Sequence, residues 1–387
     1  MMNRNPLIGL KELGQSVWLD NLSRKLINSG ELKRLIDEDG LSGITSNPTI
    51  FQKAISGSPD YDASLRRMLN QGVKDEKELF LGLAFEDISA AADLLWPVYR
   101  ATHGLDGFVS IEVSPDLAYE TEATIGEAKR LFSAIGKRNI LVKVPATKQG
   151  LPAIEQLIGE GVNVNITLLF TIERYEKVTE AYLKGLEKRV SKGQPIDEIA
   201  SVASFFVSRV DTLTDKLLGT HISSGGSKDE RDKIAGLLGK AAVANAKIAY
   251  KKYKQIFSGS RFLALREKGG RLQRILWGST GTKNPAYSDI KYVEELIGPD
   301  SINTMTEATI KAFRDHGQVR ITIGDGLEEA ERLFQELKSL GIDIHGVTEQ
   351  LEQEGVELFS DSFFSLLKEI AKKRDSFLLR GGNGHKG

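Results

Sequence analysis

The stretch Ile140–Thr147, which reads Ile-Leu-Val-Lys-Val-Pro-Ala-Thr, decides how the rest of the chain is interpreted. Its short, apolar, β-branched composition predicts a strand that is buried on both faces. Lys143 interrupts this run and shares a strand face with Leu141 and Pro145, because side chains alternate between the two faces. Burial removes the hydration of an ammonium group and favours the neutral amine, which is a nucleophile toward carbonyl carbons. The alternative is a structural lysine whose aliphatic stem packs while its charge reaches water.

Seven more segments have strand composition, and helical segments separate them. The predicted strands span residues 17–21, 41–47, 107–114, 139–147, 162–170, 201–207, 274–280 and 301–305. Strands that alternate with helices form a parallel sheet, and eight such units close into a (β/α)8 barrel. We therefore predict an α/β fold: a single TIM barrel over residues 1–380 with helical insertions and additional C-terminal helices, and a disordered tail at residues 381–387. A doubly wound open sheet is the alternative, but the first strand is not followed by the Gly-x-Gly-x-x-Gly turn that is usual there.

The composition argues against several classes of function. The 387 residues carry a formal net charge of −1 with both signs interspersed, unlike the basic surface of a nucleic-acid-binding protein. The chain has no cysteine, which excludes disulfides, thiolate metal sites and cysteine nucleophiles. Its histidines are scattered, so we expect no structural or catalytic transition metal. There is no secretory signal and no run of roughly 18 apolar residues, so we expect a cytoplasmic protein without a membrane partner.

Alternation along the third and fifth predicted strands identifies the face that lines the barrel. In residues 107–114, Val109 and Ile111 share one face while Ser110 and Glu112 share the other. The apolar face must meet the surrounding helices, so the polar face points into the barrel. The same argument directs seven polar side chains toward one interior, in the second halves of their strands, where this fold carries its catalytic groups. They are Asp20, Asn47, Glu112, Lys143, Asn165, Thr167 and Ser204.

Each of these residues also has a structural explanation. Asp20 can cap the following helix, Asn47 can close a turn before Pro48, and Glu112 can be a simple ion-pair partner of Lys143. The whole set is harder to explain in this way, because barrel interiors are normally filled by valine, isoleucine and leucine. It suits a carbonyl reaction in which the lysine attacks a ketone, its iminium accepts electrons as a carbon–carbon bond breaks, and carboxylates transfer the protons.

A phosphate site is predicted in the loops after the sixth and seventh strands. Arg209 follows the sixth strand, and Ser279 and Lys283 belong to the loop Trp-Gly-Ser-Thr-Gly-Thr-Lys-Asn-Pro after the seventh. Late loops of barrels often bind phosphate through cations and backbone N–H groups. The loop does not match a nucleotide P-loop. Solvated surface cations are the alternative explanation for Arg209 and Lys283.

Four segments resemble the transaldolase family. They are Ser-Asn-Pro-Thr at 46–49, Val-Lys-Val-Pro-Ala-Thr at 142–147, Asn-Ile-Thr-Leu-Leu-Phe at 165–170 and Ser-Phe-Phe-Val-Ser-Arg at 204–209. The likeness extends from about Val17 to the helix after Thr306, and the region beyond Ile321 resembles the longer bacterial branch. It implies a class I Schiff-base enzyme of the pentose phosphate pathway, without a cofactor. Such an enzyme moves a dihydroxyacetone unit from sedoheptulose 7-phosphate or fructose 6-phosphate to glyceraldehyde 3-phosphate or erythrose 4-phosphate.

The resemblance also implies a role for each matching residue. Lys143 forms the Schiff base, Asp20 is the base toward the C4 hydroxyl, and Glu112 with Thr167 activates a water for proton transfer. The residues that contact the substrate are Asn47, Asn165, Ser204 and Phe206. The residues that hold phosphate are Arg209, Ser279 and Lys283. Many relatives carry an arginine where this chain has Lys283, and lysine is a point charge without the bidentate fork of arginine.

Three other functions compete with this interpretation. The nearest is a fructose-6-phosphate aldolase, but that group leads us to expect glutamine and tyrosine where this chain has Glu112 and Phe206. A second is a non-catalytic barrel that binds sugar phosphates, against which Lys143, Glu112 and Asp20 argue. A metal-dependent barrel hydrolase is disfavoured by the positions of the histidines. The expected partners are sugar phosphates, and the chain is expected to be a monomer or a homodimer.

Overall fold

Eight parallel strands close into one barrel in a computed structural model that describes residues 5–225 and 227–382. The strands are β1 (Gln15–Leu19), β2 (Gly43–Ile44), β3 (Phe108–Glu112), β4 (Ile140–Pro145), β5 (Val164–Leu169), β6 (Ser201–Phe206), β7 (Arg274–Gly278) and β8 (Ser301–Met305). Each strand pairs with the next along the chain, and β1 pairs with β8 to close the sheet. The predicted α/β barrel and the order of its strands are therefore confirmed.

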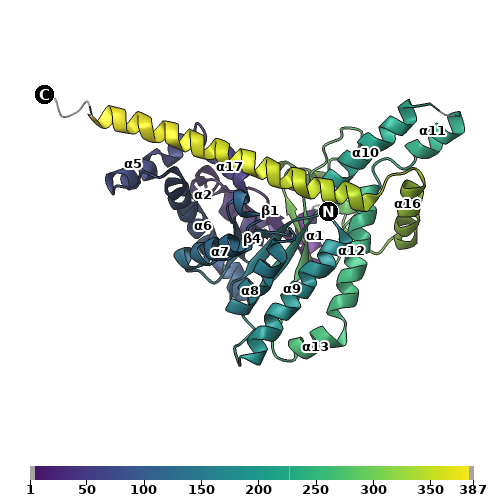
Figure 1. The fold of residues 1–387 in the computed structure, drawn as a ribbon, viewed down its shortest axis with the longest axis horizontal. Coiled ribbons are helices and arrows are strands. Elements are labelled where there is room, and N and C mark those ends of the chain that lie inside the picture. The colour runs from purple at the N-terminus through teal and green to yellow at the C-terminus, as the bar shows by residue number, and fades with distance from the viewer. Residues whose placement is uncertain (1–4, 226, 383–387) are drawn as a thin grey trace.

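Helices before, between and after the strands cover the outside of the barrel and one of its ends (Figure 1). They are α1 (Pro6–Glu12), α2 (Arg24–Asn28), α3 (Glu31–Asp39), α4 (Pro48–Ile55), α5 (Asp62–Asn70), α6 (Glu76–Ala101), α7 (Thr121–Ile135), α8 (Gly150–Glu160), α9 (Ile172–Ser191), α10 (Ser208–Ser223), α11 (Lys228–Ala235), α12 (Ala241–Phe257), α13 (Ser260–Arg266), α14 (Lys291–Glu294), α15 (Glu307–His316), α16 (Leu327–Ser339) and α17 (Ile344–Gly382). Two 3-10 turns, Pro59–Tyr61 and Pro115–Leu117, precede α5 and α7. Within the described part of the chain, no helix has the length and apolar character that crossing a membrane requires.

The prediction and the structure differ at two places. The second strand is predicted over residues 41–47, but β2 covers only Gly43–Ile44, because Asn47 already caps α4. The tail is predicted to begin at residue 381, but α17 continues to Gly382. The rest of that tail, residues 383–387, lies outside the described residues.

The barrel interior has an apolar floor. Seven buried side chains form a cluster separate from the large core outside the barrel: Trp18, Phe108, Leu141, Ala200, Val202, Leu276 and Ile302. Gly43 makes room for the indole of Trp18, since a Cβ at position 43 would lie 2.3 Å from Trp18 Cε2. Leu141 precedes Lys143 by two residues on the same strand face, so the lysine stands directly above the floor.

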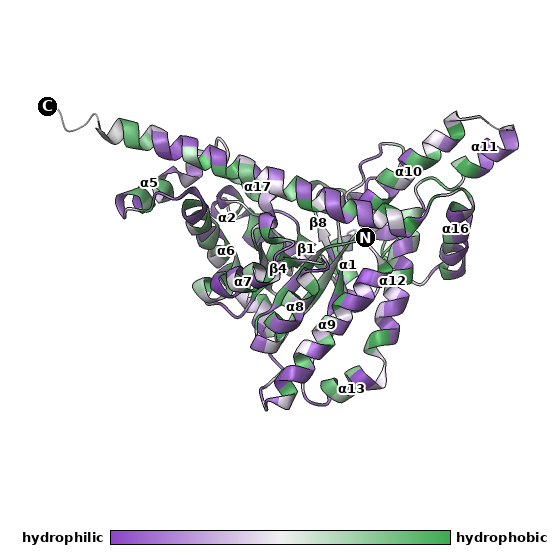
Figure 2. Ribbon diagram, in the orientation of Figure 1, coloured by the Kyte–Doolittle hydropathy of each residue, from purple (hydrophilic) through white to green (hydrophobic). Residues whose placement is uncertain are grey.

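The long helix α17 lies along the C-terminal face of the barrel (Figure 1). Its Ser362 accepts a hydrogen bond from Thr49 at 2.8 Å, and its Glu352 lies 3.4 Å from Arg174. Both partners belong to helices that follow strand ends, α4 and α9. Hydrophilic and hydrophobic residues alternate along α17 (Figure 2), as expected for a helix with the barrel on one side only. The helix therefore forms a wall over the end of the barrel where the predicted catalytic groups lie.

Candidate active site

Lys143 is buried inside the barrel, next to a carboxylate. Its Nζ donates a hydrogen bond to the Ser46 carbonyl oxygen at 3.1 Å and lies 3.6 Å from Oε2 of Glu112. The two side chains are only 4% and 3% exposed. The register explains this contact, because Lys143 pairs with Glu112 on β3 and with Asn165 on β5. Three neighbouring strands therefore bring an amine, a carboxyl group and an amide to one point of the interior.

The carboxyl group of Glu112 has a raised pKa and no hydrogen-bond partner among the described residues. Burial raises its pKa to about 7, and the charge of Lys143 opposes that rise only in part. Neither of its oxygens accepts or donates a hydrogen bond among the described residues. The hydroxyl of Thr167 is also buried and has no hydrogen-bond partner among the described residues. Both groups retain hydrogen-bonding capacity for a small polar molecule inside the barrel.

The end of β5 departs from regular geometry beside these groups. The pairing with β6 shifts register between Ile166 and Leu169, and Leu168 has φ of 54°. A left-handed backbone at a leucine is strained, and such strain costs roughly 1–3 kcal/mol. An irregularity of this kind changes the direction of nearby side chains. Thr167 itself keeps the regular alternation of β5, because it pairs with Pro145 as Asn165 pairs with Lys143.

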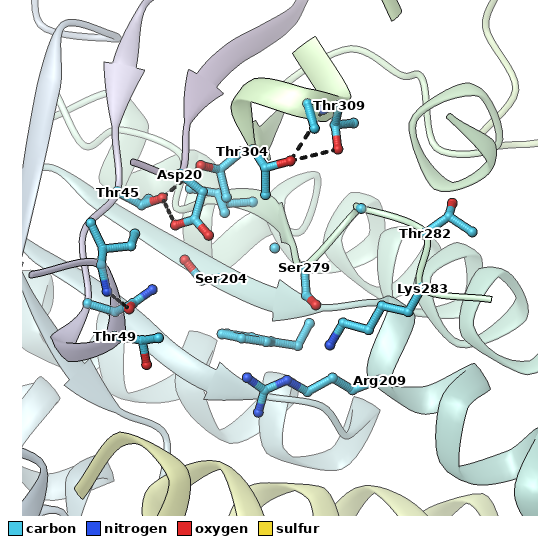
Figure 3. Close-up of a pocket in the computed structure, with 18 of the residues that line it drawn as sticks. Asp20, Thr45, Thr49, Ser204, Arg209, Ser279, Thr282, Lys283, Thr304 and Thr309 are labelled. Carbon is cyan, nitrogen blue, oxygen red and sulfur yellow. Dashed lines mark hydrogen bonds between the residues drawn. The ribbon is translucent and has the colours of Figure 1, made fainter. Parts of the chain in front are cut away.

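Asp20 supplies a second, half-buried carboxyl group directly after the end of β1. Oγ1 of Thr45 donates to its Oδ1 at 2.6 Å, as the dashed line in Figure 3 shows. Burial raises the pKa of Asp20, whereas the charge of Lys143 and the hydrogen bond from Thr45 act in the opposite direction. The ordinary explanation for Asp20, capping the next helix, is wrong, because Ser23 caps α2.

The predicted amide and hydroxyl residues form two separate arrangements. Ser204 Oγ donates to Asn165 Oδ1 at 2.6 Å, and Asn165 Nδ2 donates to Ser110 Oγ at 3.0 Å. The amide of Asn165 is therefore held within a chain of side chains and fixes the hydroxyl of Ser204. Asn47 is the N-cap of α4, and its Oδ1 accepts a hydrogen bond from the Ile50 N–H at 3.0 Å. Its side chain both caps that helix and faces the site.

A cavity of about 580 Å³ opens at this end of the barrel. Eight of the predicted site residues line it: Asp20, Asn47, Lys143, Ser204, Phe206, Arg209, Ser279 and Lys283. Glu112, Asn165 and Thr167 do not line it, and they surround Lys143 from the barrel side. The inner end of the cavity is polar, because Lys143 and Asp20 line it and Glu112 lies directly behind the amine.

Two cations lie at the outer end of the cavity. In Figure 3, the side chains of Arg209 and Lys283 run in the same direction across the cavity, near Ser279. Burial lowers the pKa of Lys283, and the neighbouring Arg209 lowers it further. Neither cation forms an ion pair with a carboxylate within residues 5–225 and 227–382. Arg209 is also the second residue of α10, whose N-terminal end favours negative charge. The geometry suits a bound anion.

Two aromatic rings lie close to the guanidinium of Arg209. Its Cζ lies 5.5 Å from the ring centroid of Phe206 and 5.9 Å from that of Phe359. Phe206 comes from β6, but Phe359 comes from α17. Ser279, which has φ of 55°, shares a 3.0 Å hydrogen bond between its hydroxyl and that of Ser208. The outer end of the cavity is thus built from β6, α10, the loop after β7 and the C-terminal helix.

Several residues that line the cavity were not predicted from the sequence: Thr45, Lys53, Thr304, Leu358 and Phe359. Thr45 carries a usable signal, because it shares one face of the predicted strand 41–47 with Asn47. Phe359 carries none, because its partner Arg209 lies on a distant part of the chain and no local pattern links them.

Comparisons with known proteins agree over almost the whole chain. A family model described as Transaldolase/Fructose-6-phosphate aldolase matches residues 17–370. A protein named Transaldolase from Trichodesmium erythraeum is 47% identical over 377 residues, which is 96% of this chain and 98% of that protein. Transaldolase 2 from a Nostoc species is 47% identical over 95% of this chain and 97% of its own length. A Transaldolase from Saccharopolyspora erythraea is 46% identical over 97% and 99%. The chain belongs to the transaldolase/fructose-6-phosphate aldolase family.

Proposed function

We propose that this chain is a transaldolase that carries a dihydroxyacetone unit on Lys143. The donor is a ketose phosphate, either sedoheptulose 7-phosphate or fructose 6-phosphate. The acceptor is an aldose phosphate, either glyceraldehyde 3-phosphate or erythrose 4-phosphate, as in the non-oxidative pentose phosphate pathway. The observation that carries this proposal is the buried amine of Lys143, 3.6 Å from a carboxyl group whose pKa is about 7, at the inner end of a polar cavity.

The first half of the reaction forms the Schiff base. The neutral amine of Lys143 attacks the C2 carbonyl of the ketose and gives a carbinolamine. Glu112 in its acid form protonates the C2 hydroxyl, which leaves as water as the iminium forms. A carboxyl group whose pKa lies near the working pH suits this transfer, because it can return to the acid form in each cycle. The unpartnered hydroxyl of Thr167 supports a role in holding a water on the proton path.

The second half breaks and remakes a carbon–carbon bond. Asp20 takes the proton of the C4 hydroxyl, the C3–C4 bond breaks, and its electron pair passes into the iminium to give an enamine on Lys143. The aldose phosphate leaves and the acceptor aldehyde takes its place. The enamine then attacks the acceptor carbonyl, Asp20 returns the proton, and hydrolysis frees Lys143. We assign Asn47, Asn165, Ser204 and Phe206 to the substrate hydroxyls and the imine region, with Asn165 acting through Ser204.

Phosphate binds at the outer end of the cavity in this proposal. Arg209 and Lys283 lack carboxylate partners among the described residues, and Ser279 adds a hydroxyl beside them. The N-terminal end of α10 contributes partial positive charge. The substrates are therefore phosphorylated sugars, held at one end by cations and at the other by the imine.

We also propose that residues 1–380 act as one domain, since one apolar core extends from Leu7 to Ile370. Sugar phosphates are cytoplasmic metabolites, and this favours the predicted location. The oligomeric state, a monomer or a homodimer, stays a prediction.

Acceptor dependence tests the proposed transfer directly. We expect little turnover of fructose 6-phosphate alone and rapid formation of sedoheptulose 7-phosphate once erythrose 4-phosphate is added. Product formation followed by coupled assay or chromatography measures both. Equally rapid release of free dihydroxyacetone without an acceptor would show an aldolase instead.

Replacing Glu112 by glutamine tests its proton-transfer role. We expect kcat to fall about 10²-fold, within the usual range for one acid–base group, and the limb of the pH profile near 7 to disappear. The folded protein favours the neutral form of Glu112, because burial raises the pKa of this group from 4.5 to about 7. The wild-type protein therefore loses stability as the pH rises from about 4.5 to about 7, where the buried group must ionise. The variant should therefore gain a few °C in Tm at pH 8 and less at pH 5. Unchanged kinetics would remove Glu112 from the mechanism.

Replacing Arg209 by alanine tests the phosphate assignment. We expect KM for fructose 6-phosphate to rise about 10-fold or more, because a charge-assisted contact to phosphate is lost. Dihydroxyacetone as an unphosphorylated donor is the control, and its KM should stay within about two-fold. An equal loss with both donors in steady-state kinetics would argue against contact between Arg209 and phosphate.

A further inference from the structure

Three side chains form a hydrogen-bonded row beside the cavity. Thr45 Oγ1 lies 2.6 Å from Asp20 Oδ1 and 2.7 Å from Thr304 Oγ1. Both contacts are drawn as dashed lines in Figure 3. All three residues line the cavity, and the two threonines are buried. The row therefore ends at the carboxyl group assigned above as the base of bond cleavage.

The direction of this row follows from counting hydrogens. A hydroxyl group has one hydrogen to donate. The hydrogen of Thr45 points to the carboxylate of Asp20, because an ionised carboxylate can only accept. Thr304 must then donate to Thr45. The order of donation is Thr304 to Thr45 to Asp20, and each hydrogen bond polarises the next.

The backbone fixes each member of the row. Asp20 lies at the end of β1, and β1 pairs with β2 on one side and β8 on the other. The N–H of Asp20 donates to the Met305 carbonyl at 2.8 Å, and the N–H of Thr45 donates to the Leu19 carbonyl at 2.9 Å. Thr45 and Thr304 thus extend from the two strands that flank β1 and meet beside its last side chain.

Charged groups surround the Asp20 carboxylate, but none of them fixes its orientation. Lys143 from β4, Arg209 from α10 and Lys53 from α4 all attract its carboxylate, and Glu112 from β3 repels it. No ion pair forms between Asp20 and any of these cations in the described ranges. The hydrogen bond from Thr45 occupies Oδ1, so Oδ2 is the oxygen available to a substrate proton.

We propose that Thr304 and Thr45 are positioning residues that hold the Asp20 carboxylate for proton transfer, with Thr304 acting only through Thr45. The proposal rests on the transaldolase function proposed above. It adds two residues to the cleavage of the C3–C4 bond, in which Asp20 takes a proton, and none to the formation of the Schiff base. Dihydroxyacetone separates the two steps, because it can form the Schiff base but has no C4 hydroxyl for Asp20 to deprotonate.

Thr304→Val is the informative variant, since valine keeps the shape of threonine and removes the hydroxyl. We expect kcat for transfer from fructose 6-phosphate to erythrose 4-phosphate to fall about 10-fold, as for the loss of one hydrogen bond to a charged group. KM for fructose 6-phosphate should stay within about two-fold. The acidic limb of the kcat profile should move to higher pH, because weaker donation stabilises the carboxylate less. Thr304→Ser should restore both.

Two controls separate this role from general damage. Among the described residues, the buried hydroxyl of Thr179 bonds only to its own helix α9, so Thr179→Val should leave kcat and the pH profile unchanged. Borohydride trapping of dihydroxyacetone should be equal in Thr304→Val and the parent, because imine formation bypasses Asp20. If the parent itself neither traps dihydroxyacetone nor transfers it, the proposed function has failed, and the proposed role of the hydrogen-bonded row fails with it.

Two other outcomes would overturn the proposed role of the hydrogen-bonded row and leave the proposed function standing. Wild-type kcat and an unmoved pH profile in Thr304→Val would show that the row does not support Asp20. Loss of trapping together with kcat, or a serine variant as poor as the valine variant, would show a structural effect at the β1–β8 seam.

Discussion

The burial of an amine beside a carboxyl group at the centre of a closed barrel is the constraint on which the rest of the structure depends. Lys143 and Glu112 are almost wholly removed from water, and their nearest charged atoms are 3.6 Å apart. Desolvation of such a pair can outweigh the attraction between its charges. The raised pKa of Glu112 is the visible result. A solvated lysine and glutamate at the same spacing would be a surface ion pair with little chemical consequence.

The fold supports this costly arrangement on all sides. An apolar floor of large side chains, with Trp18 packed over Gly43, closes the barrel below the lysine. The strained backbone at Leu168 accompanies the register shift at the end of β5, directly after Thr167. The wall formed by α17 contributes Phe359 to the site of Arg209. The two ends of the cavity thus differ in chemistry: the inner end carries the amine and carboxyl groups that we propose transfer protons, and the outer end carries two cations without carboxylate partners among the described residues.

Much of this could be predicted from local patterns. Alternation in residues 107–114 and 162–170 identified the polar face of the barrel, and register then brought Glu112 and Asn165 beside Lys143. Contacts between distant segments left no local signal, so the wall formed by α17 and the ring of Phe359 were missed. Asn165 illustrates a third case: its inward position was predicted, but its engagement with Ser204 and Ser110 depends on three strands at once.

The central claim is that the amine of Lys143 forms a covalent imine with the ketose. The most direct test is reduction with borohydride in the presence of fructose 6-phosphate, followed by mass mapping of the labelled peptide. The account predicts one modified residue, Lys143, and no labelling in Lys143→Ala. Labelling of that variant to the same extent, or a modified lysine elsewhere in the chain, would contradict it.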